Sequence, residues 1–184
     1  MSRTAQELRP AQELTPSWLL TAIGLAATAC IAAACWTAGH VHADASLLTV
    51  ARFFHVAFLV VGLGSVLAVD WFAVLWLTGK RPLAGVLDTA VALQTPIWAG
   101  LGGLVVSGLF LRPDLHSPLT LAKLGLVVAV TVNGLWAHRL GQRLEAHRTG
   151  PVPRRLLVLA GLAATVSQTG WWGASLIGFL NSQA

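Results

Sequence analysis

Five long apolar runs dominate this sequence and limit the folds open to it. They cover roughly residues 17–38, 47–78, 91–111, 119–138 and 156–180. About 20 mostly apolar residues suffice for one helix to cross the hydrocarbon of a bilayer. Only 10% of the residues are charged, whereas a soluble domain averages roughly 25%. We therefore expect an all-α fold, an integral membrane bundle of five transmembrane helices that forms one domain over residues 1–184.

The positions of the cations predict how this bundle sits in the membrane. Two of the five hydrophilic segments carry very little positive charge: 39–46 has no Lys or Arg, and 112–118 has one. The other three are rich in cations, namely Arg3, Arg9, Lys80, Arg81, Arg139, Arg143, Arg148, Arg154 and Arg155. Because cytoplasmic loops carry the excess of Lys and Arg, we expect a cytoplasmic amino terminus and an external carboxyl terminus. The expected location is a cell membrane, crossed several times, and specifically a bacterial inner membrane.

The net charge of +5 does not indicate nucleic-acid binding. A nucleic-acid interface is a basic patch or stripe on one face of a domain. Here the cations gather at the ends of apolar runs, where they orient the chain in the bilayer. We therefore expect lipid, and no nucleic acid, among the partners.

A few ionisable or strongly polar side chains interrupt the apolar runs. A charge at the bilayer centre costs at least about 2.5–3.5 kcal/mol, so such residues normally face protein or water and mark functional sites. The ionisable residues are Arg52, His55 and Asp70 in the second run and Lys123 in the fourth, and uncharged Asn133 and Gln168 complete the set.

His55 and Lys123 are predicted to lie at a similar depth. The second run is entered from outside at about residue 47 and the fourth at about residue 119, which places both side chains in the external leaflet. A neutral imidazole can ligate a haem iron or a metal ion, and a lysine amine can do so once burial favours its uncharged form. The alternative is that Lys123 extends to the surface and His55 makes one hydrogen bond in the bundle.

Two stripes of small or polar residues favour close packing of helices. Gly100, Gly103 and Ser107 follow helical spacing in the third run, where they would admit a neighbouring helix or a flat cofactor. Thr165, Gln168, Trp172 and Ser175 form a polar stripe in the fifth run, which could line a site or serve hydrogen bonding between helices.

Histidines also lie in the loops. His40, His42 and Asp44 in one external loop, with Asp114 and His116 in the other, offer donors that copper or zinc accepts. We interpret His138 and His147 as ordinary surface residues.

Short motifs in the second to fourth runs resemble two families of membrane proteins. They are Phe53-Phe54-His55-Val56-Ala57-Phe58, Ser107-Gly108-Leu109, Leu121-Ala122-Lys123-Leu124-Gly125-Leu126-Val127, and Asn133-Gly134. Over about 85 residues they are similar to CopD-like membrane proteins and to the HemJ-type protoporphyrinogen oxidases. The HemJ-type resemblance implies a haem b site with His55 and Lys123 as axial ligands, and the CopD-like resemblance implies copper handling.

Three functional hypotheses follow. The first is a haem b-binding redox protein that passes electrons in the external leaflet. Arg52 would be the partner of a haem propionate, and quinone would be a redox partner. Such a protein would be a haem-dependent membrane oxidoreductase. The second is a non-catalytic accessory or assembly subunit, working as a homo-oligomer or in a larger membrane complex. The third is a small transporter using Asp70 and Gln168, or a copper-handling protein.

Overall fold

The structure is a computed structural model that describes residues 15–40 and 43–181. Within these residues it is entirely helical, with five helices and no strands. They are α1 (Ser17–Ala38), α2 (Ala45–Leu77), α3 (Leu83–Leu109), α4 (Pro118–Glu145) and α5 (Arg154–Asn181). Arg3, Arg9 and His42, which enter the predictions above, lie outside the described residues.

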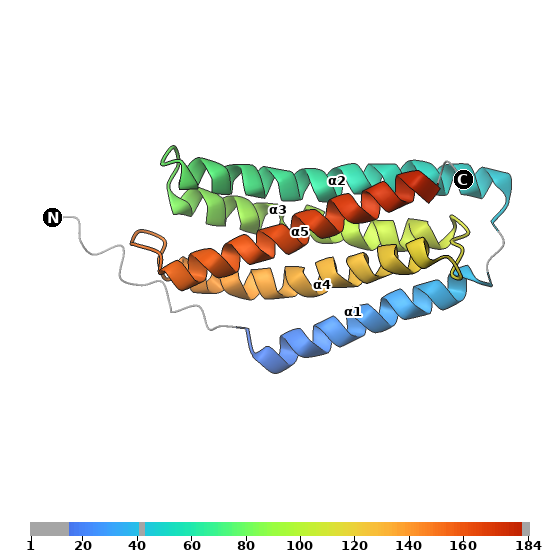
Figure 1. Cartoon of the computed structure of the whole chain (residues 1–184), viewed down its shortest axis with the longest axis horizontal. Helices are drawn as coiled ribbons and strands as arrows, with labels where there is room; N and C mark the ends of the chain where they lie inside the picture. The colour runs from blue at the N-terminus through green and yellow to red at the C-terminus, as the bar shows by residue number, and fades with distance from the viewer. Residues whose placement is uncertain (1–14, 41–42, 182–184) are drawn as a thin grey trace.

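The helices form an elongated bundle in which each runs antiparallel to the one before (Figure 1). Helix α2 packs mainly along α3, and α4 packs mainly along α5. Helix α5 crosses in front of α3 in this view (Figure 1), and its middle reaches α2, where Trp171 lies beside Gly62. Helix α1 lies on the outside of the bundle, where it contacts α3 and α4.

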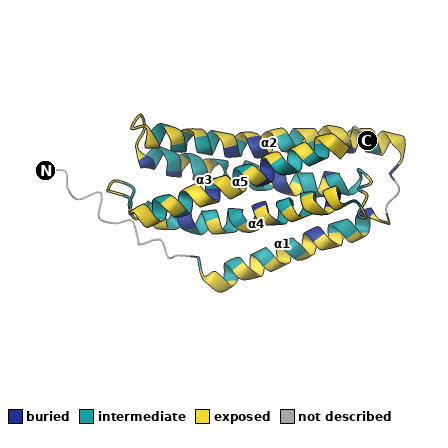
Figure 2. Ribbon diagram, in the orientation of Figure 1, coloured by how far each residue is buried: buried dark blue, intermediate teal, exposed yellow. Residues whose placement is uncertain are grey.

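The surface of this bundle suits lipid rather than water. Four helices, α1 to α4, are long and apolar enough to cross a membrane. Exposed residues run along the outward faces of the helices (Figure 2), and many of them are large and apolar, such as Trp18, Phe53 and Val91. Exposed apolar surface of this extent marks a membrane or protein contact, so the chain is a multi-pass membrane protein by its helices.

The helices extend beyond the apolar runs at one end of the bundle. Helix α3 begins at Leu83, whereas the apolar run begins at about residue 91, and α4 continues past His138 to Glu145. The added turns carry charged residues such as Asp88 and Arg143. Hydropathy marks only the part of a helix that lipid can surround, whereas the backbone hydrogen bonds continue into the aqueous boundary. Helix α2 has 33 residues, about 50 Å at 1.5 Å per residue, and so exceeds a hydrocarbon core of about 30 Å.

Close helix contacts at glycines hold the centre of the bundle together. The core cluster brings together Leu63 and Val66 of α2 with Leu101, Val130 and Trp171 of the other three inner helices. Beside it, α2 and α3 touch backbone to backbone. A methyl group added at Gly100 would lie 2.5 Å from the Cα atom of Gly62. Small residues at this position let the two helices approach closely.

Candidate functional site

His55 projects from α2 toward α3, near the end of the bundle that holds the 39–46 loop. Its Nδ1 atom lies 2.9 Å from the Oγ atom of Ser107, and Ser107 is buried. Gly108 lies beside the ring, since a Cβ atom there would be 3.5 Å from Cε1 of His55. The imidazole is therefore held against the carboxyl-terminal turns of α3.

The hydroxyl of Ser107 determines which ring nitrogen carries the proton. Ser107 Oγ donates its one hydrogen to the carbonyl oxygen of Gly103 at 2.6 Å. A hydroxyl has one donor hydrogen and two acceptor lone pairs, so toward His55 it acts as the acceptor. Nδ1 of His55 is then the donor, and in the neutral ring Nε2 is the nitrogen that carries the lone pair.

Lys123 extends from α4 toward α5 at the same end of the bundle. Its Nζ atom would lie 3.4 Å from a Cβ atom added at Gly178, so the absence of a side chain on α5 makes room for the amine. Nearby, Asn181 donates from Nδ2 to Thr120 Oγ1 at 3.5 Å and joins the ends of α5 and α4. Lys123 is half-buried and close enough to His55 for an electrostatic interaction.

Arg52 lies one helical turn from His55, toward the start of α2, and its side chain is exposed. This places a cation nearer the boundary of the bundle than the imidazole. His55, Lys123 and Arg52 thus share one end of the molecule, although His55 contacts α3 and Lys123 contacts α5.

The other polar residues within the helices join α2 and α4 to α5. Gln168 donates from Nε2 to Asp70 Oδ2, and its Oε1 accepts from the indole Nε1 of Trp172 at 2.8 Å. Asn133 donates from Nδ2 to the carbonyl oxygen of Ala163 at 2.9 Å. Each of the three predicted residues Asp70, Asn133 and Gln168 therefore makes a contact between helices.

The small-residue stripe of α3 is filled by α2. Gly100 faces the backbone of Gly62, Gly103 faces the ring of Phe58, and Ser107 bonds to His55. The hydroxyls of Thr165 and Ser175 on the α5 stripe donate to backbone carbonyls of their own helix. Along these faces, small residues serve the packing of one helix on another.

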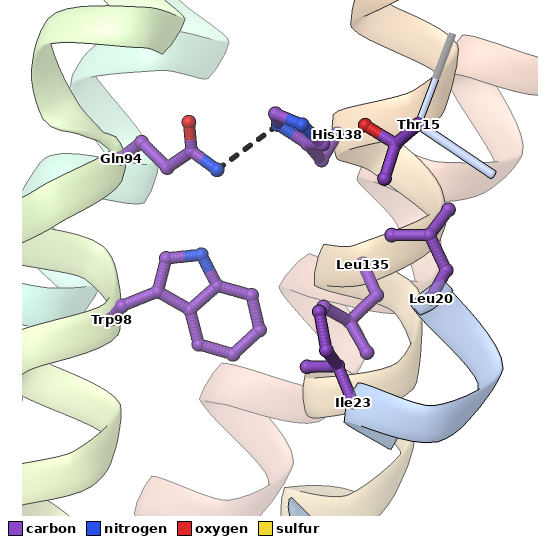
Figure 3. Close-up of a pocket in the computed structure, with 7 residues that line it drawn as sticks. All are labelled: Thr15, Leu20, Ile23, Gln94, Trp98, Leu135 and His138. Atoms are coloured by element: carbon purple, nitrogen blue, oxygen red, sulfur yellow. Dashed lines mark hydrogen bonds between the residues drawn. The ribbon is translucent and has the colours of Figure 1, made fainter. Parts of the chain in front are cut away.

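A second polar cluster, which sequence reasoning missed, lies at the opposite end of the bundle. The prediction that His138 is an ordinary surface residue is wrong, because its ring is half-buried and bonded to glutamines. Gln94 Nε2 lies 3.0 Å from His138 Nδ1, and Gln142 Nε2 lies 3.4 Å from His138 Nε2. Figure 3 shows the hydrogen bond between Gln94 and His138 at one side of a pocket. The i, i+4 spacing of His138 and Gln142 was the available signal, since it places both on one face of α4.

The loops near His55 are fixed by backbone contacts. The guanidinium of Arg112 donates to the carbonyl oxygen of Ala43, which ties the α3–α4 loop to the start of α2. Asp44 accepts from the backbone N–H of Leu47 at 2.7 Å and caps α2. This bond, together with the Ser46 hydroxyl, lowers the pKa of the Asp44 carboxyl. Among the described residues no group of three His, Cys, Asp or Glu side chains is placed to hold a metal ion.

Comparison with known proteins gives no relative for this chain: no family model, curated protein or solved structure matches it.

Proposed function

We propose that α5 is a fifth membrane span and that the protein has its amino terminus in the cytoplasm and its carboxyl terminus outside. Helix α5 runs along α4 through the bundle and has 28 residues, enough for about 42 Å. Its polar residue Gln168 is turned toward Asp70 of α2, which removes its amide from lipid. Lys80 and Arg81 lie between α2 and α3, and the cations of 139–155 lie in the last turns of α4, in the loop that follows and in the first turn of α5. The positive-inside rule assigns both groups to the cytoplasm.

Fusions to the carboxyl terminus test this topology. Alkaline phosphatase is active only outside a bacterial cytoplasmic membrane, whereas green fluorescent protein folds into its fluorescent form inside. We expect an active phosphatase fusion and a dark fluorescent-protein fusion. The reverse result would show that an even number of helices crosses the membrane or that the orientation is inverted.

We further propose that the protein binds haem b at the external end of the bundle and transfers electrons there. The observation that carries this proposal is the hydrogen-bond chain from His55 through Ser107 to the Gly103 carbonyl. Metal-binding histidines usually donate their second ring N–H to a protein acceptor, which fixes the tautomer and the ring orientation. The Nδ1 bond to Ser107 would have this role for His55.

The neighbouring residues offer donors and a cation to an anionic, iron-containing group. Glycines stand next to both candidate ligands, Gly108 beside the imidazole of His55 and Gly178 beside the amine of Lys123, so that each of these groups occupies the space that a side chain would take. Arg52 lies toward the boundary, where it would bind a propionate by charge-assisted hydrogen bonds. In this proposal His55 and Lys123 would hold the iron of the haem.

The bound group would supply one-electron chemistry through its iron. The chain's own contribution is to orient the imidazole through Ser107, to keep the amine of Lys123 half-buried beside Gly178, and to provide a cation at the boundary. Axial-ligand identity, hydrogen bonding to the ligand and burial are the levers by which a protein sets the potential of a haem.

Haem content per protein, measured as the pyridine haemochrome of detergent-purified variants, tests the proposal. We expect His55→Ala to lose at least about nine-tenths of the haem, because the fixed imidazole is the proposed ligand. His116→Ala is the matched control, because His116 is exposed in a loop at the same end, and it should retain wild-type content. Equal content in His55→Ala and His116→Ala would refute the role of His55.

The second candidate function is a non-catalytic subunit of a membrane complex. The observation that favours it is that the inward polar residues bond to one another or to backbone, as in the pairs Asp70–Gln168 and Asn133–Ala163. Such a protein would purify without an absorbing group. It would also show the same absorption spectrum after His55→Ala as before.

A further inference from the structure

The pocket at the opposite end of the bundle lies between α1, α3 and α4. Its volume is about 330 Å³, within the range of about 300–1,000 Å³ that ligand sites occupy. The residues that line it are Thr15, Leu20, Ile23, Gln94, Trp98, Leu135 and His138. His138 lies fifteen residues along α4 from Lys123, roughly 22 Å at 1.5 Å per residue. The pocket is therefore separate from the proposed haem site.

Most of the pocket wall is carbon. The flat indole of Trp98 forms one side, and Leu20, Ile23 and Leu135 face it (Figure 3). Ile23 is 43% exposed and belongs to α1, the helix on the outside of the bundle. A ligand can therefore approach along α1 from the lipid, and an apolar ring can lie against the indole.

The polar part of the pocket has a fixed orientation. The backbone N–H of Thr15 donates to Gln142 Oε1 at 3.1 Å, and Gln142 Nε2 donates to Thr15 Oγ1 at 2.9 Å. These two bonds determine which end of the Gln142 amide is nitrogen. Gln142 therefore presents an N–H donor to Nε2 of His138.

Amide groups on both sides of His138 leave one N–H group of the cluster without an acceptor among its neighbours. A neutral imidazole has one donor and one acceptor nitrogen, but amide groups face both nitrogens of His138. If Nδ1 accepts from Gln94, the N–H on Nε2 faces another donor. If Nε2 accepts from Gln142, the oxygen of Gln94 has to turn toward Nδ1, and its NH₂ group turns away. Either arrangement leaves an N–H group beside the pocket without an acceptor inside the cluster.

We infer that this pocket binds the head group of a membrane quinone. A quinone ring is flat and apolar and fits against Trp98. Its carbonyl oxygen can accept a hydrogen bond from the N–H group of the Gln94–His138 pair that has no other acceptor. A quinone also dissolves in the bilayer and can reach the site from there. A hydrogen bond contributes about 0.5–1.5 kcal/mol, so a ligand oxygen at this place is favoured over a hydrocarbon of the same shape. The site is distinct from the haem site, and it rests on the proposed redox function only for its biological purpose.

Calorimetric titration of the full-length protein in detergent tests the inference, with duroquinone as the probe. Duroquinone has both carbonyls and no free ring position at which a cysteine can add. Durene, the same methylated ring without oxygens, is the control ligand. Both ligands are dissolved in the same detergent concentration as the protein. We expect saturable binding of duroquinone to one site and at least tenfold weaker binding of durene.

Variants locate the site. Gln94→Leu should weaken duroquinone binding about tenfold, because it removes one hydrogen bond, and Gln168→Leu, the same change on α5, should leave binding unchanged. Ile23→Phe should also weaken binding by filling the pocket from an exposed position, and it decides the question if Gln94→Leu does not fold. Absence of saturable binding, equal affinity for durene, or wild-type affinity in Ile23→Phe would overturn the inference.

The same titration separates this inference from the haem proposal. His55→Ala lies at the other end of the bundle and should bind duroquinone with wild-type affinity. If the purified protein contains no haem but still binds duroquinone, the quinone site is supported and only the haem proposal is contradicted. Loss of quinone binding in His55→Ala would overturn the claim that the two sites are separate.

Discussion

Replacing Gly100 by alanine tests the contact that sets the distance between α2 and α3. A Cβ atom at this position would lie 2.5 Å from Cα and 2.6 Å from the backbone nitrogen of Gly62, and 2.9 Å from the carbonyl oxygen of Phe58. All three are backbone atoms, so no side chain can rotate to make room. Gly102 is the matched control on the same helix, because a Cβ atom there would meet nothing within 4 Å.

The expected magnitude follows from the size of the overlap. Ordinary contact begins near 3.4 Å, so α2 and α3 have to separate by roughly 1 Å, and overpacking of this kind costs about 1–3 kcal/mol. Alanine returns up to about 1 kcal/mol through its better helix propensity. We expect a net loss of about 1–2 kcal/mol in Gly100→Ala and a change between about 0 and +1 kcal/mol in Gly102→Ala.

Unfolding in mixed micelles with increasing dodecyl sulfate, followed by far-ultraviolet circular dichroism, measures both variants. The helix separation should also reach His55 and Ser107, which lie two helical turns from Gly62 and Gly100 along the same pair of helices. Under the haem proposal, Gly100→Ala should therefore lose haem as well as stability. Equal stability of Gly100→Ala and Gly102→Ala would refute the close α2–α3 contact.

Two further predictions concern single hydrogen bonds. The cap on α2 lowers the pKa of Asp44, so its contribution to stability is complete above the ordinary aspartate pKa of about 3.9 and is lost as the pH falls through the lower folded-state value. Asp44→Asn keeps a capping oxygen that does not titrate, and its melting temperature should therefore fall less than that of the wild type on acidification; parallel curves would contradict this. Asn133→Leu removes the bond to the Ala163 carbonyl and should lower the free energy of unfolding in mixed micelles by about 0.6 kcal/mol, at most about 1.7. Unchanged unfolding would mean that this bond does not join α4 to α5 in the membrane.

The sequence predicts the ends of a helix accurately where the whole helix is apolar and less accurately where it continues into polar residues. The first apolar run, 17–38, coincides with α1, because Pro16 and Gly39 flank it. Helix α3 begins before its apolar run, and the turns that contain Asp88 are helical although they are not apolar. Arg148 forms an ion pair of 2.6 Å with Asp88, a contact between distant segments that no local pattern contains.

For the candidate site, the sequence predicts the position of each residue along its helix but not the direction in which its side chain points. Counting residues from the loops places His55 and Lys123 in one leaflet, since the rise of a helix is constant. Which way each helix turns about its axis depends on packing, and so neither the Ser107 acceptor nor the position of Lys123 beside Gly178 was predicted. The environment of His138 was missed for the same reason. Thr15, which precedes α1, and Leu20 in its first turns pack beside the end of α4, a contact between distant segments.

The absorption spectrum of the purified wild-type protein, recorded as dithionite-reduced minus air-oxidised, tests the haem proposal most directly. We predict a Soret band and a sharp α band of haem b, in a ratio to protein of about one haem per chain, because one imidazole held by Ser107 is available as the proposed ligand. A featureless difference spectrum, from protein expressed with ample haem and shown to be folded by circular dichroism, would contradict it.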